Sequence, residues 1–189
     1  PDIDAASSVA ISGATITSSD RNAVRFFAVA GSVTISESTL STAGASASVL
    51  YVGGAITGPL FDVADTTITG VGLALSLVSV QGPVSLKNVA ASVAAAGDTP
   101  LAVTAITAGS IAIAGGSFTG GAGVGIKIPA LDSTSSVTIH DAVATSVAAS
   151  GISFQAIDGA VDITGGTLTG STYGVDLAGA ITTNGKVAL

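Results

Sequence analysis

Short stretches in which apolar and polar residues alternate recur along the whole chain. Side chains of a β-strand point alternately to opposite faces, so each stretch predicts a short strand with one buried face. The first apolar residues of successive stretches lie 24, 28, 23, 27, 26 and 24 positions apart, which indicates a repeat of about 25 residues with loops of variable length. The apolar pairs that define the repeat are Val9/Ile11, Val33/Ile35, Phe61/Val63, Val84/Leu86, Ile111/Ile113, Val137/Ile139 and Val161/Ile163.

Turn residues recur at a fixed place inside each repeat. Four positions after the first apolar residue, six of the seven repeats carry Gly, Asn or Asp, which tolerate tight turns and a left-handed backbone, and Glu37 is the exception. Three positions later we expect one inward-pointing residue, flanked by two outward-pointing ones. The turn positions are Gly13, Glu37, Asp65, Asn88, Gly115, Asp141 and Gly165, and the inward positions are Ile16, Leu40, Ile68, Ala91, Phe118, Ala144 and Leu168.

A third alternation, 13 to 17 residues into the repeat, predicts a third strand. In the third repeat it is less clearly placed. Gly53-Gly54-Ala55-Ile56 also resembles the start of a repeat, which predicts an insertion or bulge of about five residues in the third repeat. The predicted third strands contain Val24/Phe26, Val49/Tyr51, Leu73/Leu75/Leu77, Leu101/Val103, Val124/Ile126, Ile152/Phe154 and Val175/Leu177.

Three short strands per repeat predict an all-β fold, a parallel β-helix (β-solenoid) of about seven coils. A β-sandwich also has regularly spaced short strands, but it does not require the same turn residue at the same offset in every unit. A solenoid requires it because each coil stacks on its neighbour. We therefore interpret residues 1–189 as a single β-helix domain and expect it to be a fragment or repeat segment of a longer or polymeric rod.

Composition narrows the classes of function. Only 9% of the residues are charged, and five Lys and Arg against twelve Asp and Glu exclude a basic nucleic-acid-binding surface. The absence of cysteine excludes a disulfide scaffold and a thiolate metal site, and no apolar run is long enough to span a membrane. The abundance of Val, Ile and Thr argues against disorder.

The coil pattern resembles the right-handed parallel β-helix of the pectate-lyase-like superfamily and of bacterial autotransporter passengers and related adhesin repeats. The resemblance covers essentially the whole chain and lies in the architecture. It implies a right-handed coil and an extracellular or cell-surface location. It also implies one of two functions, a polysaccharide-active enzyme or an adhesive and structural stalk.

The acidic residues do not form the carboxylate pair that a polysaccharide-active enzyme needs. Asp62 and Asp162 share a register but lie four coils apart, which is about 19 Å at the spacing of strands, whereas glycosidase carboxylates lie roughly 5 to 9.5 Å apart. His140, the sole histidine, points outward beside Asp141 and is expected to be a solvated surface residue. Lys87 shares its register two coils away, too far for contact. We therefore expect the protein not to be an enzyme.

Two other groups of charged residues are candidate binding sites. Arg21 and Arg25 are candidates for an anion site or a substrate clamp, but an arginine pair beside Asp20 is more often plain solubilising charge. The acidic residues of the last coils lack the Gly-rich repeat typical of calcium-binding solenoids, so we expect no metal and no cofactor. These candidate calcium ligands are Asp132, Asp141, Asp158 and Asp162.

Hydroxyl residues flank the inward residue of most coils. Because side chains alternate along a strand, they predict two parallel outward rows of Thr and Ser, spaced by about 4.8 Å between coils. The rows resemble the Thr-x-Thr face of β-solenoid ice-binding proteins, although Thr is also favoured on any solvated strand face. The outward residues are Thr15, Thr17, Thr39, Ser41, Thr67, Thr69, Ser117, Thr119, Thr145, Thr167 and Thr169.

Together these features predict a structural or adhesive extracellular β-solenoid module. Exposed strand edges at each end favour end-to-end stacking, so the expected partners are copies of the chain or neighbouring coils of the same assembly, with surface polysaccharide or ice as further candidates. No nucleic-acid partner is expected. The alternatives are an ice-binding protein that uses the Thr/Ser rows and, less favoured, a pectate-lyase-like enzyme.

Overall fold

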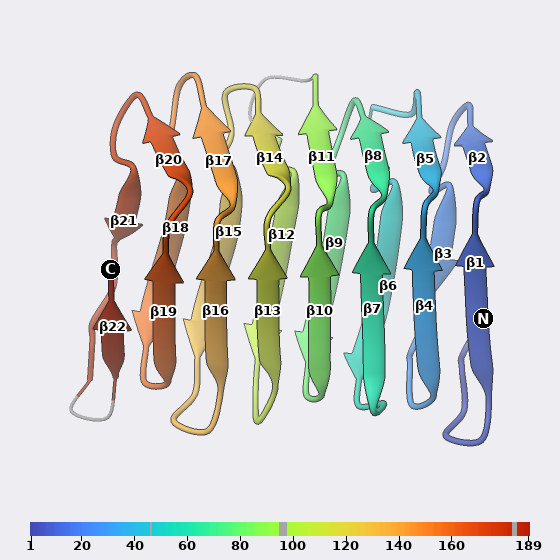
Figure 1. The fold of residues 1–189 in the computed structure, drawn as a ribbon, viewed down its shortest axis with the longest axis horizontal. Helices are drawn as coiled ribbons and strands as arrows, with labels where there is room; N and C mark the ends of the chain where they lie inside the picture. Colours follow the sequence, from blue (N-terminus) through green and yellow to red (C-terminus); the bar gives the residue numbers. More distant parts are fainter. Residues whose placement is uncertain (46, 95–97, 183–184) are drawn as a thin grey trace.

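A computed structural model describes residues 1–45, 47–94, 98–182 and 185–189. Within these residues the chain forms 22 strands and no helix. The strands build three parallel sheets that together form a β-solenoid (Figure 1). The expected all-β parallel β-helix is therefore confirmed.

Each coil contributes one strand to each sheet, in the same order. Sheet 1 contains β1 (Ser8–Ser12), β4 (Ser32–Ser36), β7 (Leu60–Ala64), β10 (Pro83–Lys87), β13 (Ser110–Ala114), β16 (Ser136–His140), β19 (Ala160–Thr164) and β22 (Lys186–Ala188). Sheet 2 contains β2 (Thr15–Ser18), β5 (Thr39–Thr42), β8 (Thr67–Gly70), β11 (Ala90–Val93), β14 (Ser117–Gly120), β17 (Val143–Ser146) and β20 (Thr167–Gly170). Sheet 3 contains β3 (Val24–Phe26), β6 (Leu50–Ile56), β9 (Leu75–Val80), β12 (Leu101–Ile106), β15 (Ile126–Leu131), β18 (Ile152–Ile157) and β21 (Val175–Leu177).

The coil winds in the right-handed sense. In Figure 1 the strands of sheets 1 and 2 lie in front and run upwards, the strands of sheet 3 lie behind and run downwards, and the chain advances from right to left. Seven coils are completed, and β22 begins an eighth by pairing with β19.

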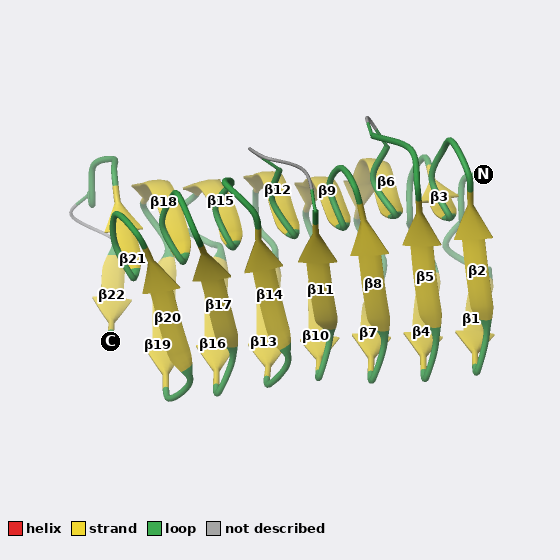
Figure 2. Ribbon diagram, turned by 90° about the horizontal axis from the view of Figure 1, so that it is seen from above, coloured by secondary structure: helices red, strands yellow, loops and turns green. Residues whose placement is uncertain are grey.

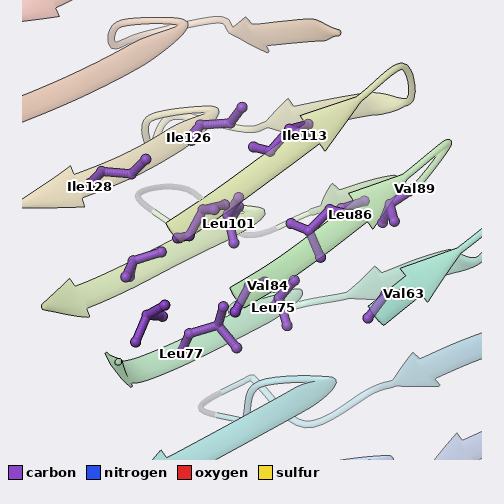
Figure 3. Close-up of a cluster of buried hydrophobic side chains, with 14 of the residues drawn as sticks. Val63, Leu75, Leu77, Val84, Leu86, Val89, Leu101, Ile113, Ile126 and Ile128 are labelled. Atoms are coloured by element: carbon purple, nitrogen blue, oxygen red, sulfur yellow. The ribbon is translucent and has the colours of Figure 1, made fainter. Parts of the chain in front are cut away.

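The core is a set of stacked columns of inward side chains. In sheet 1 the first apolar residue of each repeat pairs with its counterpart one coil away, as in Val9↔Val33 and Val33↔Phe61. In sheet 2 the inward residues of the five central coils are at most 1% exposed. Figure 3 shows the result in the middle of the rod, where side chains from β9 and β10 such as Leu77 and Leu86 project into the space between the sheets. The repeat register predicted for these two sheets is confirmed.

The turn between sheets 1 and 2 has the same backbone conformation in all seven coils. Its residue has a positive φ throughout, including Glu37 at 50° and Asn88 at 51°. Most residues with a side chain rarely adopt this left-handed backbone conformation, because the Cβ atom comes too close to the backbone. This explains why Gly, Asn or Asp occupies six of the seven positions. Glu37 adopts it despite its side chain because the strands on either side are held by the neighbouring coils.

One third strand lies in a different register from the predicted one, and another begins two residues later. In the second coil Leu50 and Val52 are the inward residues of β6 and Tyr51 faces outward, because Leu50 pairs with Val24; Val49, just before the strand, is also buried. In the fifth coil the predicted Ile126 is inward, but its partner within the strand is Ile128 rather than Val124, which precedes β15. The turns that lead into sheet 3 differ in length, so the alternation within the chain does not fix which residues face inward. Pairing with the neighbouring coil fixes it.

The predicted insertion is also wrong in place and size. Gly53 and Gly54 do not begin a repeat but lie inside β6 of the second coil. The register between β6 and β9 shifts between Val52 and Ala55, where one extra residue is accommodated as a β-bulge. A Cβ at Gly54 would lie 2.3 Å from the Phe27 carbonyl oxygen, so this close approach of two coils requires glycine.

Candidate functional site: a hydroxyl face and the ends of the solenoid

The outer surface of sheet 2 carries two straight rows of side chains, which we call the hydroxyl face. Its strands lie side by side along the rod (Figure 2). Strand pairing aligns every outward residue with its counterpart in the next coil. The first row is Thr15, Thr39, Thr67, Ala90, Ser117, Val143 and Thr167, and the second row is Thr17, Ser41, Thr69, Ser92, Thr119, Thr145 and Thr169.

The two rows differ in continuity. Ala90 and Val143 interrupt the first row, whereas every coil places a hydroxyl group in the second row. The row members are exposed or half-buried, and the hydroxyl groups of Thr17 and Ser41 lie 3.0 Å apart, within hydrogen-bond distance. The strands of sheet 2, which all lie within the described residues, contain no charged side chain. The hydroxyl face is therefore an uncharged, regular lattice with a repeat of about 4.8 Å along the rod.

The terminal coils bury their inward residues less than the coils between them do. Ile16 in the first coil and Leu168 in the last are only partly buried, whereas Leu40 between two coils is fully buried. At the C-terminal end Leu177 is 36% exposed, although Phe154, its partner one coil earlier, is 0% exposed. Both ends of the described rod thus present apolar surface beside the unpaired backbone groups of an edge strand.

The two arginines lie in one open cleft near the N-terminal end. The cleft has a volume of about 490 Å³ and is lined by Asp20, Arg21, Asn22, Arg25, Ala47, Ser48 and Tyr51. The guanidinium of Arg25 lies 4.5 Å from the centre of the Phe27 ring and 5.5 Å from that of Tyr51, both within the range of cation–π attraction. The sequence pattern did not indicate the contact with Tyr51, because it joins residues of two coils and depends on Tyr51 facing outward.

The remaining charged candidates are separated on the surface. Asp62 and Asp162 occupy the same outward column of sheet 1 with three coils between them. His140 Nδ1 lies 2.9 Å from Asp141 Oδ2, and their side chains are 60% and 62% exposed. Lys87 and His140 are aligned with Ala114 between them. These groups therefore do not converge on a common substrate position.

Asp132 organises a corner of the coil by accepting several hydrogen bonds. The Ser135 hydroxyl donates to its carboxylate at 2.6 Å, the Thr134 hydroxyl at 3.0 Å, and the Ala108 N–H at 3.0 Å. These hydrogen bonds, the one from Ser135 foremost, hold the pKa of Asp132 below its ordinary value of 3.8. The described residues contain no group of three or more His, Cys, Asp or Glu side chains placed to hold a metal ion.

Comparisons with known proteins add no assignment. No protein-family model matches the chain, and neither a curated protein nor a solved structure matches it significantly. The described part of the chain contains no helix of the length and apolarity needed to cross a membrane.

Proposed function

We propose that the protein is a structural or adhesive extracellular module that forms or extends a surface rod by end-to-end stacking of coils. The observation that carries this proposal is the incomplete burial of Ile16 at one end and of Leu168 and Leu177 at the other. In every central coil the corresponding column positions are covered from both sides. A further coil placed on either end would cover these residues and pair the free strand edge.

The free energy gained by stacking is modest for each residue, but it sums over all the residues that the end surface covers. Full burial of a Val, Leu or Ile side chain contributes about 1.5–3 kcal/mol, so covering a half-buried one contributes roughly 1 kcal/mol. Each terminal coil offers several such residues, with Val9 and Ile11 at one end and Val175 and Val187 at the other. Because association also costs translational and rotational entropy, assembly is expected to depend on protein concentration.

A matched pair of leucine substitutions tests the proposal. Leu177 at the C-terminal end is 36% exposed and Leu60 on the side of the rod is 40% exposed. Leu177→Lys places a charge on the stacking surface, and Leu60→Lys places the same charge on the outer face of sheet 1. We expect the wild type and Leu60→Lys to form filaments or end-to-end oligomers in sedimentation velocity and negative-stain electron microscopy, and Leu177→Lys to remain as single rods.

Two outcomes would contradict the proposal. One is a wild-type chain that stays a single short rod at every concentration. The other is assembly that survives Leu177→Lys but is lost in Leu60→Lys, which would indicate lateral rather than end-to-end contact. The extracellular location rests on the resemblance to secreted β-solenoids, and protease accessibility on intact cells of the source organism tests it.

Ice binding is the second candidate function, and the continuity of the second row of the hydroxyl face favours it. An uncharged surface with hydroxyl and methyl groups at a regular spacing is able to order water in a repeating pattern. Thr119→Lys interrupts this row in its middle, and Thr138→Lys makes the same change on an exposed position of sheet 1. If the face binds ice, thermal hysteresis and inhibition of ice recrystallisation are present in the wild type and in Thr138→Lys and lost in Thr119→Lys. Absence of both activities from the wild type would exclude this candidate.

A further inference from the structure

The start of the chain and its C-terminal strand occupy equivalent places in the solenoid. Ile3 bridges to Val29 at the N-terminal end, and Ile181 bridges to Ile157 at the C-terminal end, in both cases on the third side of a coil. In each case the first inward residue of the next sheet 1 strand follows six positions later, at Val9 in β1 and at Val187 in β22. Ile3 with β1 and Ile181 with β22 are therefore the same structural step, seven coils apart.

Opposite charges end one outward column of sheet 3. Register pairing aligns Arg25 in β3, at the N-terminal edge of the sheet, with Asp176 in β21, at the C-terminal edge. Between them the column passes through Tyr51, Ser76, Ala102, Lys127 and Ser153. Within the described residues neither Arg25 nor Asp176 has an oppositely charged side chain within 4.0 Å. Each of these two side chains can therefore form an ion pair with an oppositely charged residue of a second rod that contacts its end.

We propose that the rods join head to tail by strand replacement: Ile3 and β1 of an incoming copy take the places of Ile181 and β22, and its Arg25 then pairs with Asp176. This inference rests on the proposed function and specifies its partner, a second copy of the chain. With β22 in place, an incoming β1 cannot pair with β19 and is held one coil further out. The incoming β2 and β3 then lie too far from β20 and β21 to pair with them. With Ile181 and β22 displaced, all three strands of the incoming coil continue the sheets.

The residues that would meet at this joint match each other. In sheet 2, Thr15 and Thr17 of the incoming copy would continue the two rows of the hydroxyl face from Thr167 and Thr169. Ile16 would cover Leu168, and both are partly buried in the single rod. In sheet 3 the incoming strand would bring Phe26 onto Leu177 and place Arg25 about 4.8 Å from Asp176, measured between their Cα atoms.

The strand that must leave is weakly held. β22 pairs with β19 through three residues, whereas β1 pairs with β4 through five. Lys186 and Ala188 are exposed, and Val187 is only partly buried. An incoming β1 offers two inward apolar residues, Val9 and Ile11, and a longer ladder of hydrogen bonds. Exchange therefore replaces a short strand with a longer one.

A reversible cross-link tests the replacement step. Ala160 and Lys186 are paired and exposed, and neighbouring parallel strands are about 4.8 Å apart, within the range that a disulfide spans. Ala160→Cys with Lys186→Cys locks β22 when oxidised. Ala112→Cys with Thr138→Cys makes the same kind of link between two central coils and serves as the control. The wild-type chain has no cysteine, so these are the sole cross-links.

We expect the β22 lock to suppress assembly when oxidised and to permit it after reduction, with the control pair assembling in both states. Assembly of the oxidised lock to the wild-type extent would overturn the inference. The readout is the sedimentation profile of one sample before and after addition of reductant.

Charge reversal tests the ion pair of the joint. Arg25→Glu and Asp176→Arg each place like charges together, and we expect each to weaken assembly about tenfold at low salt, with the combined variant restored to near the wild-type level. Lys127→Glu makes the same charge change as Arg25→Glu in the middle of the same column and is expected to leave assembly unchanged. Single variants that assemble like the wild type, or a combined variant that is not restored, would overturn the pairing.

The failure of this joint is distinguishable from the failure of the proposed function. A wild type that never assembles contradicts both. A wild type that assembles end to end, with an oxidised lock that assembles equally well and charge variants without effect, retains the structural rod and refutes strand replacement.

Discussion

The stacking of coils predicts that one substitution has different costs at two places in the same column. Leu40 and Leu168 are both the inward residue of a sheet 2 strand, in Thr-Leu-Ser and Thr-Leu-Thr respectively. Leu40 lies between Ile16 and Ile68 of the neighbouring coils, and Leu168 has Ala144 on one side. Local sequence and strand type are thus matched, and the number of covering coils differs.

The magnitudes follow from burial. Leu40 is 0% exposed, so Leu40→Ala removes a fully covered side chain and leaves a cavity, which costs about 3–4 kcal/mol in the free energy of unfolding. Leu168 is partly buried, and its truncation leaves a depression open to water rather than a closed cavity. We expect Leu168→Ala to cost about half as much, roughly 1–2 kcal/mol.

Urea unfolding followed by far-ultraviolet circular dichroism measures both costs, at a concentration where sedimentation shows single rods. Hydrogen exchange shows which coils are destabilised. Because each coil of a solenoid contacts only its neighbours, Leu168→Ala should increase exchange in the last coils first. Equal losses in the two variants, or a larger loss for Leu168→Ala, would refute the reasoning. In assembled rods the cost of Leu168→Ala should rise towards that of Leu40→Ala, because a further coil then covers it.

Three further changes have defined outcomes. Glu37→Gly should raise the free energy of unfolding by about 1 kcal/mol, because its φ of 50° is unfavourable for a residue with a side chain; chemical denaturation checks this. Gly54→Ala should lower the melting temperature, because its Cβ would lie 2.3 Å from a backbone oxygen. Asp132→Asn should lose stability relative to the wild type at neutral pH. In melting curves this difference should begin to shrink as the pH falls below 3.8 and vanish below the pKa of Asp132 in the folded state, which is lower than in the unfolded state.

The repeat, the strands of sheets 1 and 2 and the turn between these sheets are predictable from the amino-acid sequence. These features depend on local chemistry. Strand alternation places residues such as Val33 and Ile35 on one face, and the left-handed turn selects residues such as Gly13 and Asp141 at a fixed offset. The Thr and Ser residues of the hydroxyl face follow from the same short-range pattern, so their outward orientation was predictable.

Features that depend on pairing between coils became visible in the three-dimensional structure. Turns of variable length precede sheet 3, so the chain alone did not reveal that Leu50 rather than Tyr51 faces inward, or that Gly53 and Gly54 lie in a bulge. The stacking of Arg25 on Tyr51 and the alignment of Arg25 with Asp176 have the same origin. Register between strands some 25 residues apart is set by the backbone hydrogen bonds of neighbouring coils, which no local pattern encodes.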